Sequence, residues 1–106
     1  MTPYEQEDIR TILGKIYSPS IVKAWDINDR VAETLLEMSA QITNCSKLMA
    51  LVPRPLPAGG RPLQYISKEA RRMLMSQLKE DETYLSCVKA GALGYRTRFE
   101  EASLGL

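Results

Sequence analysis

The stretch that decides the fold is VAETLLEMSAQITNCSKLMALV, residues 31–52. Its apolar residues recur at alternating steps of four and three positions, at Val31, Leu35, Met38, Ile42, Cys45, Met49 and Val52. This spacing puts them on one face of an α-helix that packs along another helix. Asn28 is suited to begin the helix, and Pro53 and Pro55 stop it. We therefore expect a long helix over about residues 28–52.

A second segment with the same pattern follows Ser67, which is suited to cap a helix. Its apolar positions are Leu74, Leu78, Leu85, Val88, Ala92, Tyr95, Phe99, Ala102 and Leu106. Asp81 alone breaks the pattern. Gly91 and Gly94 indicate either the close approach of another helix or a break, because glycine is costly inside a helix. We expect a second long helix over about residues 67–103.

The N-terminus predicts a third helix, over about residues 3–17. Thr2 and Glu5 form a capping-box pattern around Pro3, which suits the first helical position. The apolar positions that follow, with the spacing of one buried helix face, are Ile9, Ile12, Leu13 and Ile16. Residues 18–27 either extend the helix of residues 28–52 or form a short helix of their own that begins at Ser18.

These three segments predict an all-α fold, because no stretch alternates with the period of a strand. Two long apolar stripes with a short interruption predict an antiparallel helical hairpin, joined by the N-terminal helix in a single domain of residues 1–106. The result is a three-helix bundle or a dimeric helical bundle, and the pattern fits a monomer and a homodimer equally well. Apolar residues beside the stripes, which a second copy could cover, are Val22, Met75, Tyr84 and Leu93.

The connector between the two long stripes, residues 53–66, is rich in proline and glycine and carries Arg-Pro-Leu twice. It lies within the only strongly basic part of the chain: residues 38–72 hold six basic residues and one acid, a net charge of +5. A proline-stiffened segment loses less entropy when it binds. The connector and the helix start beside it are therefore the predicted partner-binding site, comprising Arg54, Leu56, Arg61, Leu63, Tyr65, Lys68, Arg71 and Arg72.

The composition offers little for catalysis. The chain has no histidine, no Walker A or Rossmann glycine pattern, and no spacing typical of a metal site. Cys45 and Cys87 lack a Cys-x-x-Cys spacing and are interpreted as two buried apolar side chains, with a disulfide between two helices as the alternative. We expect no enzyme activity, cofactor or bound metal. The absence of a signal peptide and of a long apolar run predicts a cytoplasmic protein that does not enter a membrane.

Binding is the function that remains. We expect a protein–protein interaction module, such as an adaptor, assembly factor or inhibitor, that acts through the basic connector, an exposed helix face or both. The alternative is a nucleic-acid-binding protein whose basic tip contacts phosphates, although a net charge of +1 for the whole chain is low for that class.

Overall fold

The computed structural model describes residues 1–42, 45–50 and 66–105. Within these ranges the chain is helical and contains no strand, which confirms the all-α class. The helices are α1 (Pro3–Ile16), α2 (Pro19–Val22), α3 (Asp29–Ala40), α4 (Ser46–Ala50), α5 (Lys68–Leu78), α6 (Glu82–Gly91) and α7 (Tyr95–Ser103).

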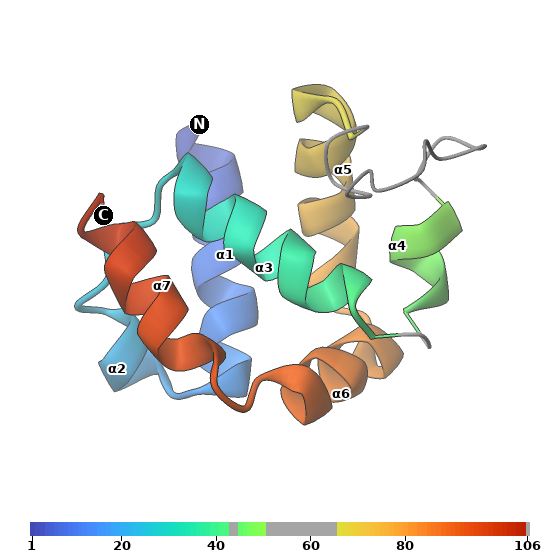
Figure 1. Cartoon of the computed structure of the whole chain (residues 1–106). Coiled ribbons are helices and arrows are strands. Elements are labelled where there is room, and N and C mark those ends of the chain that lie inside the picture. The colour runs from blue at the N-terminus through green and yellow to red at the C-terminus, as the bar shows by residue number, and fades with distance from the viewer. Residues whose placement is uncertain (43–44, 51–65, 106) are drawn as a thin grey trace, which may run out of the picture.

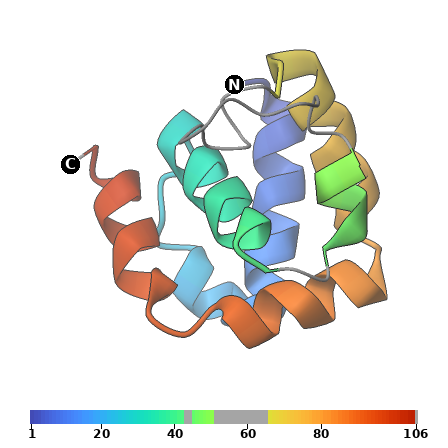
Figure 2. The same ribbon diagram turned by 45° about the vertical axis from the view of Figure 1, so that its right-hand side comes forward.

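The bundle is organised around α1 and α3, which lie in the middle of the molecule (Figure 1). α7 and α5 lie on opposite sides of this pair, and α6 crosses one end of it, as the turned view in Figure 2 also shows. α1 contacts α2, α5 and α6, whereas α3 contacts α4, α6 and α7. Because α1 and α3 touch most of the other helices, they carry the central layer of the fold.

The predicted helix starts are confirmed at four positions. Each capping side chain accepts a hydrogen bond from the backbone N–H three residues later, as helix N-caps do. The distances are 3.2 Å at Thr2, 3.3 Å at Ser18, 3.1 Å at Asn28 and 3.1 Å at Ser67. The N-terminal helix therefore has the expected bounds, and residues 18–27 contain a separate short helix, α2, rather than an extension of α3.

The long helix expected over residues 67–103 is divided into α5, α6 and α7. The first break is at Asp81, whose carboxylate accepts a 2.8 Å hydrogen bond from the N–H of Tyr84 and so caps α6. The second is at Gly94, which has a φ of 87°, a left-handed conformation that side-chain-bearing residues rarely adopt. Gly91, in contrast, is a site of close approach: a Cβ there would lie 2.6 Å from Cδ1 of Ile42.

The helix expected over residues 28–52 is likewise interrupted. α3 ends at Ala40, and α4 begins only at Ser46. Ile42, beyond the end of α3, packs on Gly91 of α6. The predicted core positions Val31, Leu35, Met38 and Cys45 are nevertheless all buried. The heptad spacing therefore predicted correctly which of these residues are buried. It did not predict the break, because two short consecutive helices can bury the same residues as one long helix.

The expected antiparallel pairing occurs between α3 and α7. The Asn28 side chain at the start of α3 donates a 3.1 Å hydrogen bond to the carbonyl of Ala102 near the end of α7. At the other end, the Tyr95 hydroxyl donates a 2.6 Å bond to Gln41. α5 does not continue this pairing but packs against α1. This corrects the expected two-helix hairpin to a bundle in which the C-terminal segment wraps around α1 and α3.

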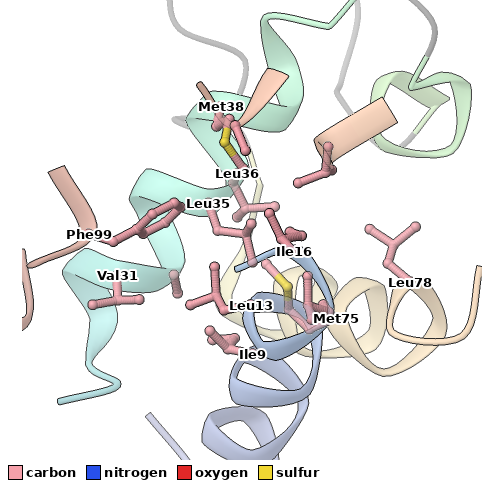
Figure 3. Packing of buried hydrophobic residues seen from close by; sticks show 14 of the residues in the cluster. Ile9, Leu13, Ile16, Val31, Leu35, Leu36, Met38, Met75, Leu78 and Phe99 are labelled. Atoms are coloured by element: carbon pink, nitrogen blue, oxygen red, sulfur yellow. The ribbon is translucent and has the colours of Figure 1, made fainter. Parts of the chain in front are cut away.

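The core is one cluster to which every helix contributes. Figure 3 shows side chains of α1, α3, α5 and α7 converging on it. At one end, the Phe99 ring stacks on Trp25, with ring centroids 5.8 Å apart and the planes inclined by 22°. The Tyr17 ring meets both at steeper angles, and burial raises the pKa of its hydroxyl to about 12. This aromatic group joins α7 to the segment between α1 and α3.

Most apolar residues that a second copy was expected to cover are covered within the chain. Val22, Met75 and Tyr84 are buried, and Leu93 is 96% exposed. A homodimer therefore remains a prediction. Three of the four residues that supported it are buried within one chain and need no second copy to cover them. None of the helices in the described ranges is long and apolar enough to span a membrane.

Candidate functional site

The structure places the described part of the predicted site at the start of α5. Arg54, Leu56, Arg61, Leu63 and Tyr65 lie outside the described residues. Lys68, Arg71 and Arg72 lie in the first turns of α5, directly after its cap. Lys68 and Arg72 are exposed, whereas Arg71 is buried. The two adjacent arginines thus have different environments and require separate interpretations.

Arg71 holds three helix starts together. Its Nε donates a 2.8 Å hydrogen bond to Glu5 in the first turn of α1, and its Nη2 donates a 3.1 Å bond to Asp29 at the start of α3. Glu5 is only 3% exposed and Arg71 only 7%. Buried charges require partners of this kind. The prediction that Arg71 binds a partner is therefore corrected, because its guanidinium is buried and already bonded to Glu5 and Asp29.

Helix phase explains why Arg71 points inward. Leu74, Met75 and Leu78 follow it by three, four and seven positions, and all three are buried. Side chains at these spacings share one face of a helix, which in α5 is the face toward α1. Arg72 is one position further and lies outside this face. Glu5 and Asp29 lie at helix starts, where the helix dipole favours acids. Arg71 also lies near a helix start, where the dipole disfavours a cation, and its two carboxylate partners offset this cost.

An open groove lies next to this junction, along α1 and α5. It encloses about 450 Å³ and is lined by Thr2, Tyr4, Arg72, Met73, Ser76 and Gln77. Tyr4 is 53% exposed and Met73 is 57% exposed. Few large apolar side chains in the described ranges are this exposed, and the others are Leu93 and Leu104. The groove therefore combines apolar area with hydroxyl, amide and guanidinium groups.

The Tyr4 ring is fixed within this groove. Its hydroxyl is 2.7 Å from the hydroxyl of Ser76 on α5. The ammonium of Lys79 lies 5.6 Å from the ring centre, in a cation–π contact. Lys79 is itself held by Asp8, 2.7 Å away, and the hydrogen bond to that carboxylate raises the pKa of Lys79. An aromatic side chain that is positioned before binding loses little freedom when a partner covers it.

A second recess of about 400 Å³ shares Thr2 and Arg72 with the groove and extends to the start of α5. Besides the buried Glu5 and Arg71, its lining includes Met1, Lys68 and Glu69. The exposed cations Lys68 and Arg72 thus lie at one end of the surface that carries Tyr4 and Met73. We call this surface, comprising Tyr4, Lys68, Arg72, Met73 and Ser76, the α1–α5 groove.

Lys47, another cation of the basic segment, also has a carboxylate partner. It forms an ion pair with Asp81, the residue that caps α6. The hydrogen bond from Lys47 holds the pKa of the Asp81 carboxyl below its usual value. Lys47 and Arg71 thus each pair with a carboxylate. Within the described part of residues 38–72, the exposed cations that form no ion pair are Lys68 and Arg72.

Sequence reasoning missed Tyr4 and Met73 as site residues. In the sequence, Met73 lies beside the apolar stripe of residues 67–103, as Met75, Tyr84 and Leu93 do. The structure separates these, because Met75 and Tyr84 are buried while Met73 and Leu93 are exposed. Tyr4 gave a weak signal, since it is a large aromatic residue off the buried face of α1. Only the packing of α1 on α5 brings Tyr4 and Met73 together.

Comparisons with protein families, with curated proteins and with solved structures find no match to this chain. In residues 1–42, 45–50 and 66–105, no group of three or more His, Cys, Asp or Glu side chains is arranged to hold a metal ion. The chemistry that the α1–α5 groove offers is apolar contact, hydrogen bonding and positive charge.

Proposed function

We propose that the protein is a non-enzymatic protein-interaction module whose α1–α5 groove binds an acidic segment of a partner protein that carries a large apolar side chain. The observation that carries this proposal is the pairing of two exposed apolar side chains, Tyr4 and Met73, beside the exposed cation Arg72 in one groove. Tyrosine, methionine and arginine are residue types enriched in protein interfaces.

The chemistry of the groove indicates the partner's chemistry. Burying Tyr4 and Met73 against an apolar side chain supplies affinity at about 25 cal/mol per Å² of apolar surface covered. Lys68 and Arg72 favour carboxylates at the end of the groove near the start of α5. The connector, residues 53–66, leads directly into α5, and we propose that its residues Arg54, Leu56, Arg61, Leu63 and Tyr65 extend the same binding surface. Adaptor, assembly factor and inhibitor are the proposed roles.

Binding to nucleic acid is the weaker candidate. Phosphate binding depends on the number of available cations. Arg71 is buried against two carboxylates, and Lys47 is paired with Asp81. These pairs reduce the positive charge that the basic segment can offer to phosphates. Exposed apolar side chains in the groove add nothing to a phosphate contact, whereas they suit a protein partner.

A comparison of variants in a capture experiment tests this proposal. The wild-type protein and a Tyr4→Ser/Met73→Ser variant, each immobilised and exposed to nuclease-treated lysate of the native host, are compared by quantitative mass spectrometry. We expect at least one protein that the wild type captures to fall by about tenfold or more with the variant, the loss typical of removing interface anchors.

The matched control is Leu93→Ser/Leu104→Ser, which removes two exposed apolar side chains elsewhere on the surface. It should capture the partner as the wild type does, and circular dichroism should show equal helicity for all three proteins. If both double variants lose the same proteins, the capture reflects general surface stickiness and the groove proposal fails. If the wild type captures the partner only from a parallel lysate that has not been treated with nuclease, the phosphate-binding alternative replaces the groove proposal.

A further inference from the structure

Ile42 and Lys47 contact opposite ends of α6. Ile42 packs on Gly91 at the end of α6, where a Cβ would lie only 2.6 Å from its Cδ1. Lys47 forms an ion pair with Asp81, the cap at the start of α6. Ser39, just before Ile42, adds a 3.0 Å hydrogen bond to the hydroxyl of Tyr84. Ser39, Ile42 and Lys47 are therefore each held against α6.

These contacts bring the two cysteines of the chain together. Cys45 lies between Ile42 and Lys47, and its N–H donates a 3.1 Å hydrogen bond to the carbonyl of Ile42. Cys87 precedes Gly91 by one helical turn, on the same face of α6. The contacts of Ile42 with Gly91 and of Lys47 with Asp81 place Cys45 against the middle of α6, where Cys87 lies. The Cys87 thiol is near enough to contribute to the raised pKa of the Cys45 thiol. Neither cysteine is in a disulfide.

The two thiols differ in access to solvent. Cys45 is 3% exposed and belongs to the hydrophobic core, whereas Cys87 is partly exposed at its edge. Burial, and then the neighbouring Cys87, raise the pKa of the Cys45 thiol to about 11. A thiolate is the reactive form of cysteine, and a reagent must reach it. Cys87 is therefore the point of entry, and Cys45 is placed to react second.

We propose that Cys45 and Cys87 form a reversible intramolecular disulfide by exchange with a low-molecular-weight disulfide. The Cys87 thiolate attacks one sulfur of the small disulfide, which forms a mixed disulfide and releases one small thiolate. Cys45, as its thiolate, then attacks the Cys87 sulfur, which closes the protein disulfide and releases the second small thiolate. The protein loses two protons and two electrons, and the small disulfide is reduced to two thiols.

The disulfide would tie the start of α4 to α6 and close a loop from residue 45 to residue 87. This loop contains the whole connector, residues 53–66, so the cross-link would restrict the chain on both sides of it. Restricting a loop of this length in the unfolded chain should raise the thermal midpoint by at least about 5 °C. The pairing depends on the contacts of Ile42 and Lys47 with α6 and not on the α1–α5 groove.

The test uses the whole reduced protein in buffers that contain different ratios of reduced to oxidised glutathione. We expect oxidation to remove two hydrogens from the intact mass, and peptide mapping to find a link between Cys45 and Cys87. The thermal midpoint should rise with the fraction oxidised, and dithiothreitol should reverse both changes. Cys45→Ala should instead retain glutathione at Cys87, whereas Cys87→Ala should bind little glutathione because Cys45 is buried.

Two results would overturn the proposal, and both are read from the wild-type protein, so the folding of the variants does not affect them. One is a wild-type protein that stops at the glutathione adduct without closing the internal link. The other is oxidation that yields only disulfides between two copies, or none at all, at ratios where glutathione itself is largely oxidised. Because Tyr4→Ser/Met73→Ser leaves both cysteines in place, it should oxidise as the wild type does. The disulfide and the groove can therefore fail separately.

Discussion

Replacement of Arg71 by methionine should lower the free energy of unfolding by about 3–5 kcal/mol. Arg71 is 7% exposed and neutralises Glu5, which is 3% exposed, and it also bonds Asp29. Methionine fills much of the same volume but leaves the Glu5 carboxylate buried without its cation. Urea unfolding followed by circular dichroism measures this loss. A large loss is expected because one side chain joins the starts of α1, α3 and α5.

The adjacent arginine is the natural control. Arg72 is exposed, so Arg72→Met should change the free energy of unfolding by no more than about 0.5 kcal/mol. It should instead weaken capture of the partner, since Arg72 lines the α1–α5 groove. The double replacement Glu5→Gln/Arg71→Met should recover part of the lost stability, because no buried carboxylate is left unpaired. Equal stability losses for Arg71→Met and Arg72→Met would contradict the structural role of Arg71.

Replacement of Phe99 by alanine should cost about 3–5 kcal/mol of the free energy of unfolding, through lost burial and the cavity left behind. Phe99 is fully buried and packs against the rings of Trp25 and Tyr17. The emission of Trp25, the only tryptophan in the chain, should shift to longer wavelength as solvent reaches it. Denaturant unfolding followed by both fluorescence and circular dichroism gives the two readings together.

Leu93→Ala provides the control for Phe99→Ala. Leu93 is 96% exposed and lies only a few residues earlier, in the turn that precedes α7. It should change the free energy of unfolding by less than about 0.5 kcal/mol. If Phe99→Ala unfolds at the same denaturant concentration as Leu93→Ala, the packing of α7 on Tyr17 and Trp25, between α1 and α3, is contradicted.

Local features of this fold could be predicted from the sequence because they depend on neighbouring residues. Thr2, Ser18, Asn28 and Ser67 were expected to begin helices, and each does so by the hydrogen bond of a helix cap. Helix continuity was less predictable. Apolar residues at steps of three and four lie on one side of a single long helix, but they also fit several short helices that wrap around a common core.

The sequence does contain signals for the two helix breaks within residues 67–103. Asp81 interrupts the apolar stripe and precedes Glu82, a pairing typical of a helix start. Gly94 was a possible break, and its positive φ is one that glycine adopts at little cost. Gly91 could not be separated from Gly94 by sequence, because its role depends on Ile42, which is distant along the chain.

The candidate site was predictable only in part. Lys68 and Arg72 were identified from charge, and both are exposed at the start of α5. Arg71 was included with them, although its spacing from Leu74 and Leu78 already indicated the buried face. Tyr4 and Met73 could not be joined by sequence, since nothing local specifies that α1 packs on α5. Their proximity is a product of tertiary packing.

The central proposal, that the α1–α5 groove binds a protein partner, is tested most directly by site-specific photo-crosslinking in the native host. A photoreactive phenylalanine analogue replaces Met73 in one protein and Leu93 in another, both of which are exposed positions. We predict that illumination links the protein to a discrete partner from position 73 and not from position 93. A crosslink of equal yield from both positions, or one found only at position 93, would contradict binding through the groove.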